Sequence, residues 1–448
     1  MVDGDVHPRA IDVFSHYYRQ LESGVTGVIV EDDIEPVVGL PSLSAVDIDE
    51  AQAREALSAT VVVKLNGGLG TSMGMARAKS LLTVRDQHTF LDVIAQQVLA
   101  VRTRYGVGLP LLFMNSFRTH DDTLAALGEH PGLAVDDLPM DFIQNREPKL
   151  LADDLSPVEW PADPTLEWCP PGHGDLYTAL ETSGTLRALL DSGYRYASVS
   201  NADNLGAAPN ATMAGWFAAS AAPYAAEVCR RTPADRKGGH LVRRRSDGRL
   251  VLRETAQIRA EDADVAADID RHPYFHTNNL WFDLRVLATT LAERDGVLGL
   301  PLIRNDKTVD PSDPASPGVV QVETAMGAAV EVFPGARAIE VDRSRFLPVK
   351  TTNDLLVMRS DVYVLGDDGI LSTQLDRIPM VDLDRQHYSS IAKFDRRFPA
   401  GPPSLRQAES LTVHGDWTFG EGVVVLGNGL LDGGRGEVAA GARIGDSA

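Results

Sequence analysis

The stretch from Val61 to Ser80, VVVKLNGGLGTSMGMARAKS, constrains the fold of this chain more than any other. It begins with a β-branched run typical of a buried strand and continues into Gly67, Gly68 and Gly70, with Lys79 further on. Glycine permits positive φ and lets backbone N–H groups approach an anion closely, so α/β folds bind phosphates at such turns. The alternative is a strand–turn–helix junction in which the glycines serve only the backbone geometry.

The glycine spacing excludes the two commonest phosphate-binding motifs. No Lys-Ser/Thr pair follows a glycine at the offset of G-x-x-x-x-G-K-[ST]. Gly74 comes one position too late after Gly68 and Gly70 for G-x-G-x-x-G. If this turn binds phosphate, it does so with a different pattern, and the rest of the chain must decide between the two interpretations.

Length and cysteine content indicate a multidomain protein of a reducing compartment. At 448 residues the chain exceeds one ordinary hydrophobic core, so two or three domains are expected. Its apolar runs are too short for a membrane span, and its N-terminus lacks the features of a signal peptide. Cys169 and Cys229 are too few for a disulfide framework or a four-cysteine zinc site. We therefore expect a cytoplasmic location and no membrane partner.

The charge balance argues against nucleic acid as a partner. The formal net charge is −21, whereas nucleic-acid binding requires a basic face. Only seven of the 42 basic residues are lysines. A lysine in a glycine- or threonine-rich turn therefore stands out, because its compact ammonium suits a crowded phosphate site.

Three segments are expected along the chain. Residues 1–58 are polar and acidic, with a helix over Ala10–Ser23, and form an N-terminal helical extension. Residues 59–402 alternate strands and helices, including a helix over Thr178–Leu190, with polar residues after the strands. This is the doubly wound α/β pattern, in which ligands bind at the carboxyl ends of the strands. Residues 403–448 carry short apolar pieces between glycines, typical of a β-solenoid or small barrel that could provide an oligomer contact.

Two polar stretches fall where such a site would lie. In Pro170–Asp175 (PPGHGD) a rigid turn presents His173 beside an open amide; alternatively, His173 is merely exposed and Asp175 is a helix N-cap. In Ser200–Asn204 an apolar strand ends in Asp203, as in many enzymes that hold Mg²⁺ between a carboxylate and substrate phosphates. An Asx turn explains the second stretch equally well.

Two further stretches offer sugar and phosphate ligands. Phe275–Trp281 (FHTNNLW) contains paired asparagines, which suit sugar hydroxyls but also cap helices. Arg343–Thr352 gathers two arginines and Lys350 in an otherwise acidic chain. A solvated basic strand is the simpler interpretation, but the apolar run before Lys350 favours a charge that is directed from a buried segment.

Taken together, these motifs resemble a known family. KLNGGLGTSMG, MNSFRTHDDT, PPGHGDLY, SNADNLGA, ETAQI, HTNNLWF, QVETAMGAA and SRFLPVKTTNDL occur in an order and spacing similar to the eukaryotic-type UTP–glucose-1-phosphate uridylyltransferases (UDP-glucose pyrophosphorylases). The resemblance spans Val61 to Tyr363 and the glycine-rich tail. It implies an α/β chain with a Rossmann-like nucleotidyltransferase domain of GT-A type and a small C-terminal left-handed β-helix.

The resemblance also assigns roles. It implies UTP binding by Leu65, Asn66, Gly67, Gly68, Lys79, Gln144, Gly172, Asn201, Ala202, Asp203 and Lys350. It implies sugar-phosphate binding by Gly67, Gly68, His173, Glu254, Asn278 and Asn279. Asp203 would be the Mg²⁺ ligand, and Lys79 and Lys350 the catalytic cations. One departure is Met75-Ala76-Arg77-Ala78 in place of the usual Cys-Lys-Gly-Pro, with Arg77 a candidate replacement for the missing lysine.

The implied reaction joins UTP and glucose 1-phosphate to give UDP-glucose and pyrophosphate. The sugar phosphate is already an anion, so the site must align and neutralise two polyanions and needs no general base. A broader UDP-sugar or UDP-N-acetylhexosamine pyrophosphorylase would keep this chemistry with a different sugar pocket. A non-catalytic sugar-nucleotide sensor is the alternative from another class, and it would have no need of a metal-binding aspartate.

Overall fold

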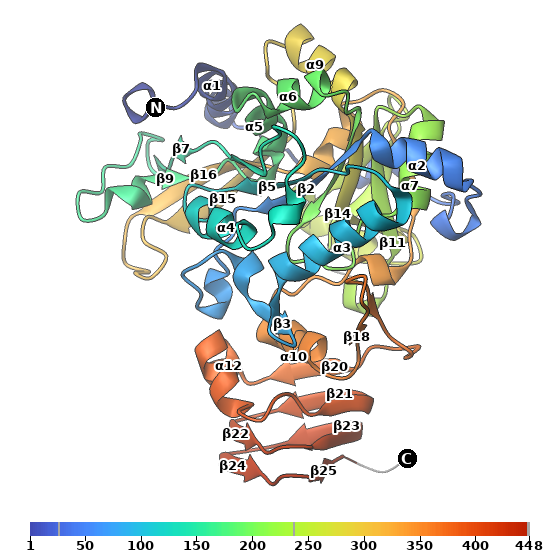
Figure 1. Ribbon diagram of the computed structural model, residues 1–448. Helices are drawn as coiled ribbons and strands as arrows, with labels where there is room; N and C mark the ends of the chain where they lie inside the picture. The colour runs from blue at the N-terminus through green and yellow to red at the C-terminus, as the bar shows by residue number, and fades with distance from the viewer. Residues whose placement is uncertain (26, 236–237, 446–448) are drawn as a thin grey trace.

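The structure is a computed structural model that describes residues 1–25, 27–235 and 238–445 (Figure 1). Its centre is a ten-stranded mixed sheet with the main order β1-β12-β14-β10-β2-β5-β6, in which β11 pairs with β14 and β17, and β13 with β12. The strands are β1 (Ile34–Pro36), β2 (Thr60–Asn66), β5 (Leu111–Asn115), β6 (Asp141–Ile143), β10 (Tyr196–Asn201), β11 (Tyr224–Arg230), β12 (His240–Arg244), β13 (Leu250–Arg253), β14 (Tyr274–Asp283) and β17 (Arg337–Glu340).

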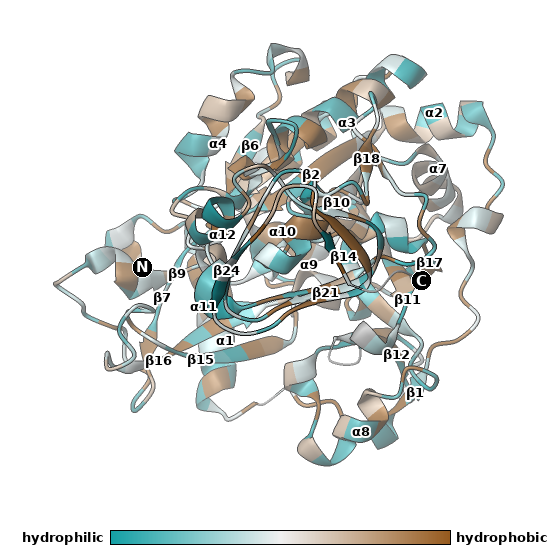
Figure 2. Ribbon diagram, turned by 90° about the horizontal axis from the view of Figure 1, so that it is seen from below, coloured by the Kyte–Doolittle hydropathy of each residue, from teal (hydrophilic) through white to brown (hydrophobic). Residues whose placement is uncertain are grey.

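Helices cover both faces of this sheet, as the alternation of strands and helices predicts. Val61 and Val63 of β2 pack into one hydrophobic cluster and Val62 into the other, because successive side chains of a strand point to opposite faces. Figure 2 shows the hydrophobic interior at β14 and the more hydrophilic helix α4 nearer the periphery. The helices are α1 (Pro8–Glu22), α2 (Glu50–Ser58), α3 (Phe90–Tyr105), α4 (His120–Leu127), α5 (Leu176–Thr182), α6 (Thr185–Asp191), α7 (Ala211–Ser220), α8 (Ala263–Ala266), α9 (Leu284–Glu293), α10 (Thr352–Arg359), α11 (Arg385–Tyr388) and α12 (Ile391–Arg397).

One expected helix is divided. The segment predicted as a single helix over Thr178–Leu190 forms α5 and α6, which are separated at Gly184. Gly184 has φ 76°, a left-handed conformation that glycine adopts without a Cβ clash and that interrupts the helix. The prediction of one continuous helix was therefore wrong at this glycine.

The N-terminal segment packs on the rest of the chain. Strand β1 joins the main sheet, with Ile34 opposite Arg244 of β12. Helix α1 buries Tyr17 and Leu21 against a small sheet of β8 (Leu150–Leu151), β15 (Leu302–Thr308) and β16 (Gly318–Thr324). The division at residue 58 stays a prediction. Among the described residues, no helix is both long and apolar enough to cross a membrane.

The C-terminal strands form a parallel stack below the main body (Figure 1). The sheet order is β20-β21-β23-β25, all parallel, and β22 runs parallel to β24 beside it. These strands are β20 (Met380–Leu383), β21 (Ser404–Val413), β22 (Asp416–Phe419), β23 (Val424–Leu431), β24 (Arg435–Val438) and β25 (Arg443–Ile444). The stack begins at Met380, ahead of the predicted boundary at 403, and residues 446–448 lie outside the described part. The three-domain division stays a prediction.

The remaining strands are short and connect the larger elements. They are β3 (Thr83–Arg85), β4 (His88–Thr89), β7 (Glu147–Pro148), β9 (Trp168–Cys169), β18 (Val364–Leu365) and β19 (Leu371–Ser372).

Candidate functional site

The site lies where the parallel strands β2, β5 and β10 end together. Asn201 at the end of β10 pairs with Leu65 of β2, and the N–H of Ala202 donates to the Leu65 carbonyl at 3.0 Å. The loops that follow β2 and β10 therefore leave the sheet side by side. This is the edge at which doubly wound sheets bind their ligands.

A cleft of about 310 Å³ opens at this edge. Its lining comes from the loops after β2, β6 and β10 and from the PPGHGD turn, segments far apart in sequence. The lining residues are Leu65, Asn66, Gly67, Gly68, Lys79, Ser80, Met114, Gln144, Pro170, Gly172, His173, Asn201, Ala202 and Asp203. Of the candidates from the sequence, Lys350, Glu254, Asn278 and Asn279 are outside this lining.

The glycine turn after β2 is held close against its neighbours. A Cβ on Gly67 would lie 2.8 Å from Nε2 of Gln144, so the absence of a side chain lets Gln144 reach the turn. The N–H of Lys79 donates to the Gly68 carbonyl at 3.1 Å, which docks the lysine onto the glycine loop. The buried Asn66 amide instead donates to Asn115 and Thr123 at 2.8 and 2.9 Å. The side chain of Asn66 thus supports the turn from beneath.

Lys79 and Asp203 meet in the cleft. Lys79 Nζ lies 2.5 Å from Asp203 Oδ2, and the two side chains are 16% and 20% exposed. Each charge therefore neutralises the other. A cation that bound Asp203 would release the ammonium of Lys79 toward an incoming anion, since the two compete for the same carboxylate.

His173 presents a neutral N–H donor. Its Nδ1 accepts from the N–H of Met326 at 2.9 Å, which leaves the proton on Nε2. Burial lowers the pKa of His173 to about 4, so the ring is uncharged at neutral pH. The turn sits on the end of β16: a Cβ on Gly174 would overlap the Thr324 side chain, and Gly172 has φ 78°. Both glycines are required to bring His173 to the cleft.

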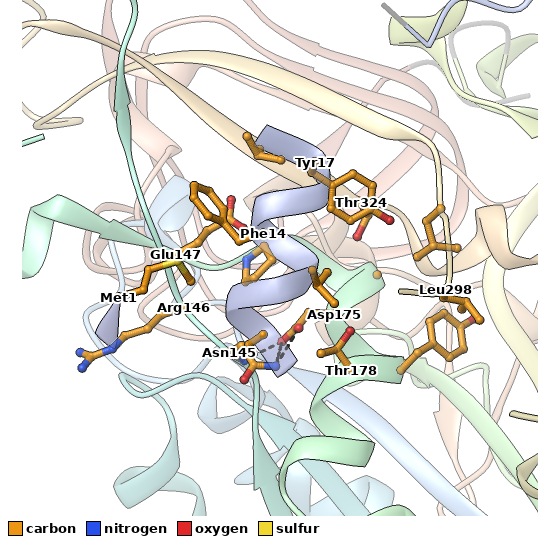
Figure 3. A pocket seen from close by; sticks show the side chains of 17 residues that line it. Met1, Phe14, Tyr17, Asn145, Arg146, Glu147, Asp175, Thr178, Leu298 and Thr324 are labelled. Carbon is orange, nitrogen blue, oxygen red and sulfur yellow. Dashed lines mark hydrogen bonds between the residues drawn. The ribbon is translucent and has the colours of Figure 1, made fainter. Parts of the chain in front are cut away.

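Asp175 lies behind His173 and joins two loops of the site. Its carboxylate accepts from the backbone N–H and the side-chain amide of Asn145, at 2.5 and 2.9 Å. It stands at the N-cap position of α5, as one interpretation of the sequence had it, but it makes no side-chain cap bond to that helix. Figure 3 shows the Asn145–Asp175 contact on a second, small cavity of about 30 Å³ under α1.

Lys350 reaches the site from another segment. The N–H of Val349 donates to the Asp203 carbonyl at 3.2 Å, so the backbone before Lys350 lies against the Asp203 loop. Lys350 itself is exposed. Burial raises the pKa of the Glu254 carboxyl, and the positive charge of Lys350 opposes that rise. The segment that ends at Lys350 thus packs against the Asp203 loop, and the charge of Lys350 acts on Glu254.

The two asparagines of HTNNLW have different environments. Asn278 has a left-handed backbone, φ 59°, and its N–H donates to Nδ1 of His276 at 2.9 Å. Asn279 is buried, and its amide bonds to Asn204, Glu227 and the carbonyl of Arg345. The amide of Asn279 is therefore engaged inside the fold.

Arg77 does not join the cleft. Its Nε lies 3.3 Å from Asp122 Oδ2, and the Arg77 side chain is 66% exposed. The expectation that Arg77 replaces the missing lysine of the loop finds no support in this geometry.

The sequence analysis did not single out Glu227, which is buried, or Arg345, which is partly buried, although both lie near the site. Glu227 lies in the apolar strand β11, and Arg345 pairs with it at 2.7 Å. A carboxylate inside the run YAAEVCR is the signal that could have identified Glu227, because an unpaired buried charge is costly.

Known proteins of one family are similar to this chain. A family model described as UTP–glucose-1-phosphate uridylyltransferase matches residues 11–426. The enzyme of that name from Solanum tuberosum is 39% identical over 398 residues, which cover 88% of this chain and 81% of the potato protein. The one from Encephalitozoon cuniculi is 33% identical over 430 residues, covering 95% of this chain and 84% of its own.

Solved structures of UDP-glucose pyrophosphorylases are also similar to this chain. A variant of the UDP-glucose pyrophosphorylase from Leishmania major, in complex with UDP-glucose, has a TM-score of 0.92 and 42% identity, covering 100% of this chain and 96% of its own. A UDP-glucose phosphorylase from Trypanosoma brucei has a TM-score of 0.90 and 42% identity, covering 99% and 96%. The mixed α/β fold with its C-terminal parallel sheet is thus shared with these proteins.

Proposed function

The chain belongs to the UTP–glucose-1-phosphate uridylyltransferase family and has that activity, and from this premise we propose how its residues perform the reaction. UTP lies in the cleft between the glycine loop and Asp203, with its base toward Gln144, Gly172 and Leu65. The single observation that carries this proposal is the cleft itself, which gathers the glycine turn, Lys79, His173 and Asp203 at one sheet edge.

The phosphates of UTP are held by the backbone and by lysines. Gly67 and Gly68 offer open N–H groups, since neither has a side chain to block an anion. Asn201 and Ala202 line the ribose side of the cleft. Lys79, released from Asp203 when the substrates bind, neutralises the triphosphate, and Lys350 does so from the facing segment.

Asp203 fits the role of Mg²⁺ ligand. Among residues 1–25, 27–235 and 238–445, no group of three or more His, Cys, Asp or Glu side chains could hold a metal ion. One carboxylate therefore needs substrate phosphates and water to complete an octahedron, which is the usual arrangement of Mg²⁺ on nucleotides. When bound, the ion would offset charge on the phosphates and hold them in alignment.

The reaction is an in-line displacement at phosphorus. A phosphate oxygen of glucose 1-phosphate forms a bond to the α-phosphorus of UTP, and the bond to the bridging oxygen of the β-phosphate breaks. That electron pair leaves with pyrophosphate. No proton must be removed from the nucleophile, so the task of Lys79 and Lys350 is to stabilise developing negative charge. His173 donates its Nε2 hydrogen to the sugar phosphate and holds it in position.

The sugar ring is bound by Glu254 and Asn278, which come from separate segments, and the charge of Lys350 acts on Glu254. Partial burial of the Glu254 carboxylate suits it to accept hydrogen bonds from sugar hydroxyls. A broader UDP-sugar or UDP-N-acetylhexosamine specificity would depend on these same residues. A non-catalytic sensor is disfavoured, because a sensor would not need Lys79, Asp203 and Lys350 together.

Domain organisation and cellular context complete the proposal. Residues 59–402 form a Rossmann-like GT-A domain, and 403–448 a left-handed β-helix, in keeping with the parallel C-terminal strands. Among the described strands, β25 pairs only with β23, and this open edge could serve as a homo-oligomer contact. The two free, buried cysteines suit a reducing cytoplasm.

Pyrophosphate release tests the specificity. UTP and other nucleoside triphosphates are combined with glucose 1-phosphate, galactose 1-phosphate and N-acetylglucosamine 1-phosphate, with and without Mg²⁺. We expect UTP with glucose 1-phosphate to exceed every other pair in kcat/KM and to require Mg²⁺. Equal rates with several sugar phosphates would favour the broader enzyme, and no release with any pair would contradict the mechanism.

A further inference from the structure

Glu227 is an ionised carboxylate buried in the central sheet. It lies in β11 with 0% of its surface exposed, yet it carries four donated hydrogen bonds. Arg345 contributes two of them, from Nε at 2.7 Å and NH2 at 2.8 Å, and Trp281 donates one from Nε1 at 3.0 Å. Burial alone would raise the pKa of Glu227, but Arg345 and the other donors hold it below its ordinary value.

Arg345 ties this carboxylate to the loop that follows β10. The third guanidinium nitrogen, NH1, donates to the carbonyl of Ala208 at 3.1 Å. The Arg345 carbonyl accepts from the side-chain amides of Asn204 and Asn279, both at 3.1 Å. Arg345 is therefore fixed at its side chain and its backbone at once, against the loop that carries Asp203.

The same contacts continue toward Lys350. The N–H of Leu347 donates to Asn204 Oδ1 at 2.8 Å, and the N–H of Val349 donates to the Asp203 carbonyl at 3.2 Å. Residues 345–349 thus lie along residues 203–208, and Lys350 is the next residue. The glycine at 206 permits this approach, because a Cβ there would overlap the Ser344 carbonyl.

A buried ion pair is a poor device for stability alone. Replacing one by apolar residues is often neutral or stabilising, because removing two charges from water costs several kcal/mol. Here the ion pair instead holds the segment 345–350 against the loop that follows β10. These two segments carry Lys350 and Asp203. The geometry of the ion pair determines where Lys350 stands relative to Asp203.

We propose that Glu227 and Arg345 form a positioning clamp that sets Lys350 against Asp203 for transfer of the uridylyl group. Neither residue lines the cleft, so both act through the segment 345–350. This inference rests on the proposed role of Lys350. It predicts that loosening the clamp lowers kcat while UTP still binds through the untouched glycine loop.

The test uses Arg345→Lys, which keeps the charge but loses the paired hydrogen bonds to Glu227. Glu227→Gln is the second variant, because it retains an acceptor for Trp281. We expect each to lower kcat by about 10- to 100-fold, as a displacement of roughly 1 Å can do, with the KM for UTP within about threefold. Unchanged kcat in both folded variants, or a loss confined to KM, would overturn the clamp.

A matched control lies on the same strand. Arg230 makes a similar two-bond pair with Glu340, at 2.8 and 3.2 Å, but its side chain is 64% exposed. Arg230→Lys should leave kcat unchanged. An equal fall in this control would show that the effect of Arg345→Lys is not specific to the clamp.

The decisive measurement repeats Arg345→Lys and Glu227→Gln in a Lys350→Ala background. If the clamp acts through Lys350, neither change lowers kcat by more than about twofold once Lys350 is absent, because the two sites are coupled. The same loss in both backgrounds would overturn the clamp while leaving the role of Lys350 intact. Wild-type turnover in Lys350→Ala alone would instead contradict the proposed role of Lys350. Should either single variant fail to fold, the other carries the test, and failure of both would assign the pair to stability and overturn the proposal.

Discussion

Breaking the Lys79–Asp203 pair provides a sharp test of the site, because stability and activity should respond differently. The two charged atoms are 2.5 Å apart, and the side chains are 16% and 20% exposed. Unit charges about 4 Å apart near a protein surface attract by about 4 kcal/mol at an effective dielectric constant of roughly 20, and charges that are closer attract more strongly. Desolvation offsets much of this, so we expect Lys79→Met or Asp203→Asn to lower the free energy of unfolding by about 1–3 kcal/mol.

The double variant Lys79→Met/Asp203→Asn should lose less stability than the two single variants together, by about 1–2 kcal/mol. No charge is then left without a partner. Its turnover should stay at least about a hundredfold below wild type, since a metal ligand and a phosphate-binding cation are both missing. Recovery of stability without recovery of activity is the expected result.

Urea unfolding without nucleotide or Mg²⁺ measures the stability, and pyrophosphate release measures the activity. Arg77→Met is the control, since Arg77 pairs with Asp122 at 3.3 Å while 66% exposed. Such a surface pair should contribute less than about 1 kcal/mol. Strictly additive losses in Lys79→Met and Asp203→Asn would refute the pairing in the free protein. Full activity in the double variant would refute the catalytic roles.

Three further predictions concern other parts of the site. Lys350→Ala should lower kcat by about two to four decades, as loss of one electrostatic donor does, and near wild-type turnover in a pyrophosphate assay would rule out its role. Gly174→Ala should lower activity and thermal stability, because its Cβ would overlap Thr324 and displace the His173 turn. An unchanged melting temperature would contradict this close packing of Gly174 on Thr324. The free energy of unfolding should fall as the pH drops from about 6.5, the ordinary histidine pKa, to about 4, because the unfolded chain binds protons before the folded one. Burial lowers the pKa of His173 and of His276 to about 4 each. In urea melts at the two pH values, His173→Gln should therefore remove the part of this fall in unfolding free energy that comes from His173, at most about 3 kcal/mol. An unchanged pH dependence in the variant would contradict the burial of His173 in its neutral form.

The structure confirms that the segments after several strands meet at one edge of the sheet. The sequence predicted that polar residues after apolar strands would meet at one edge, and the cleft does combine the turns at Gly67, His173 and Asp203. This succeeded because parallel strands in one sheet end on the same side. The pairing of Lys79 with Asp203, 124 residues apart, could not be read from either local segment.

Side-chain direction within these motifs could not be predicted. Asn66 and Asn279 belong to motifs that point to ligand binding, and the structure turns both side-chain amides inward, to Asn115 and to Glu227, although Asn66 also lines the cleft. Neighbouring residues of a strand face opposite sides, so the register of the sheet decides which side chain reaches the cleft.

The sequence by itself determined the family, the α/β alternation, the glycine turn and most residues of the cleft, because local motifs and their spacing are enough to identify these features. Only the tertiary structure decided that Glu227 and Arg345 meet, that Lys350 lies beside the Asp203 loop, and that Gly184 divides a helix. The first two depend on long-range packing that no single segment encodes. The third depends on a φ value that glycine permits but does not require.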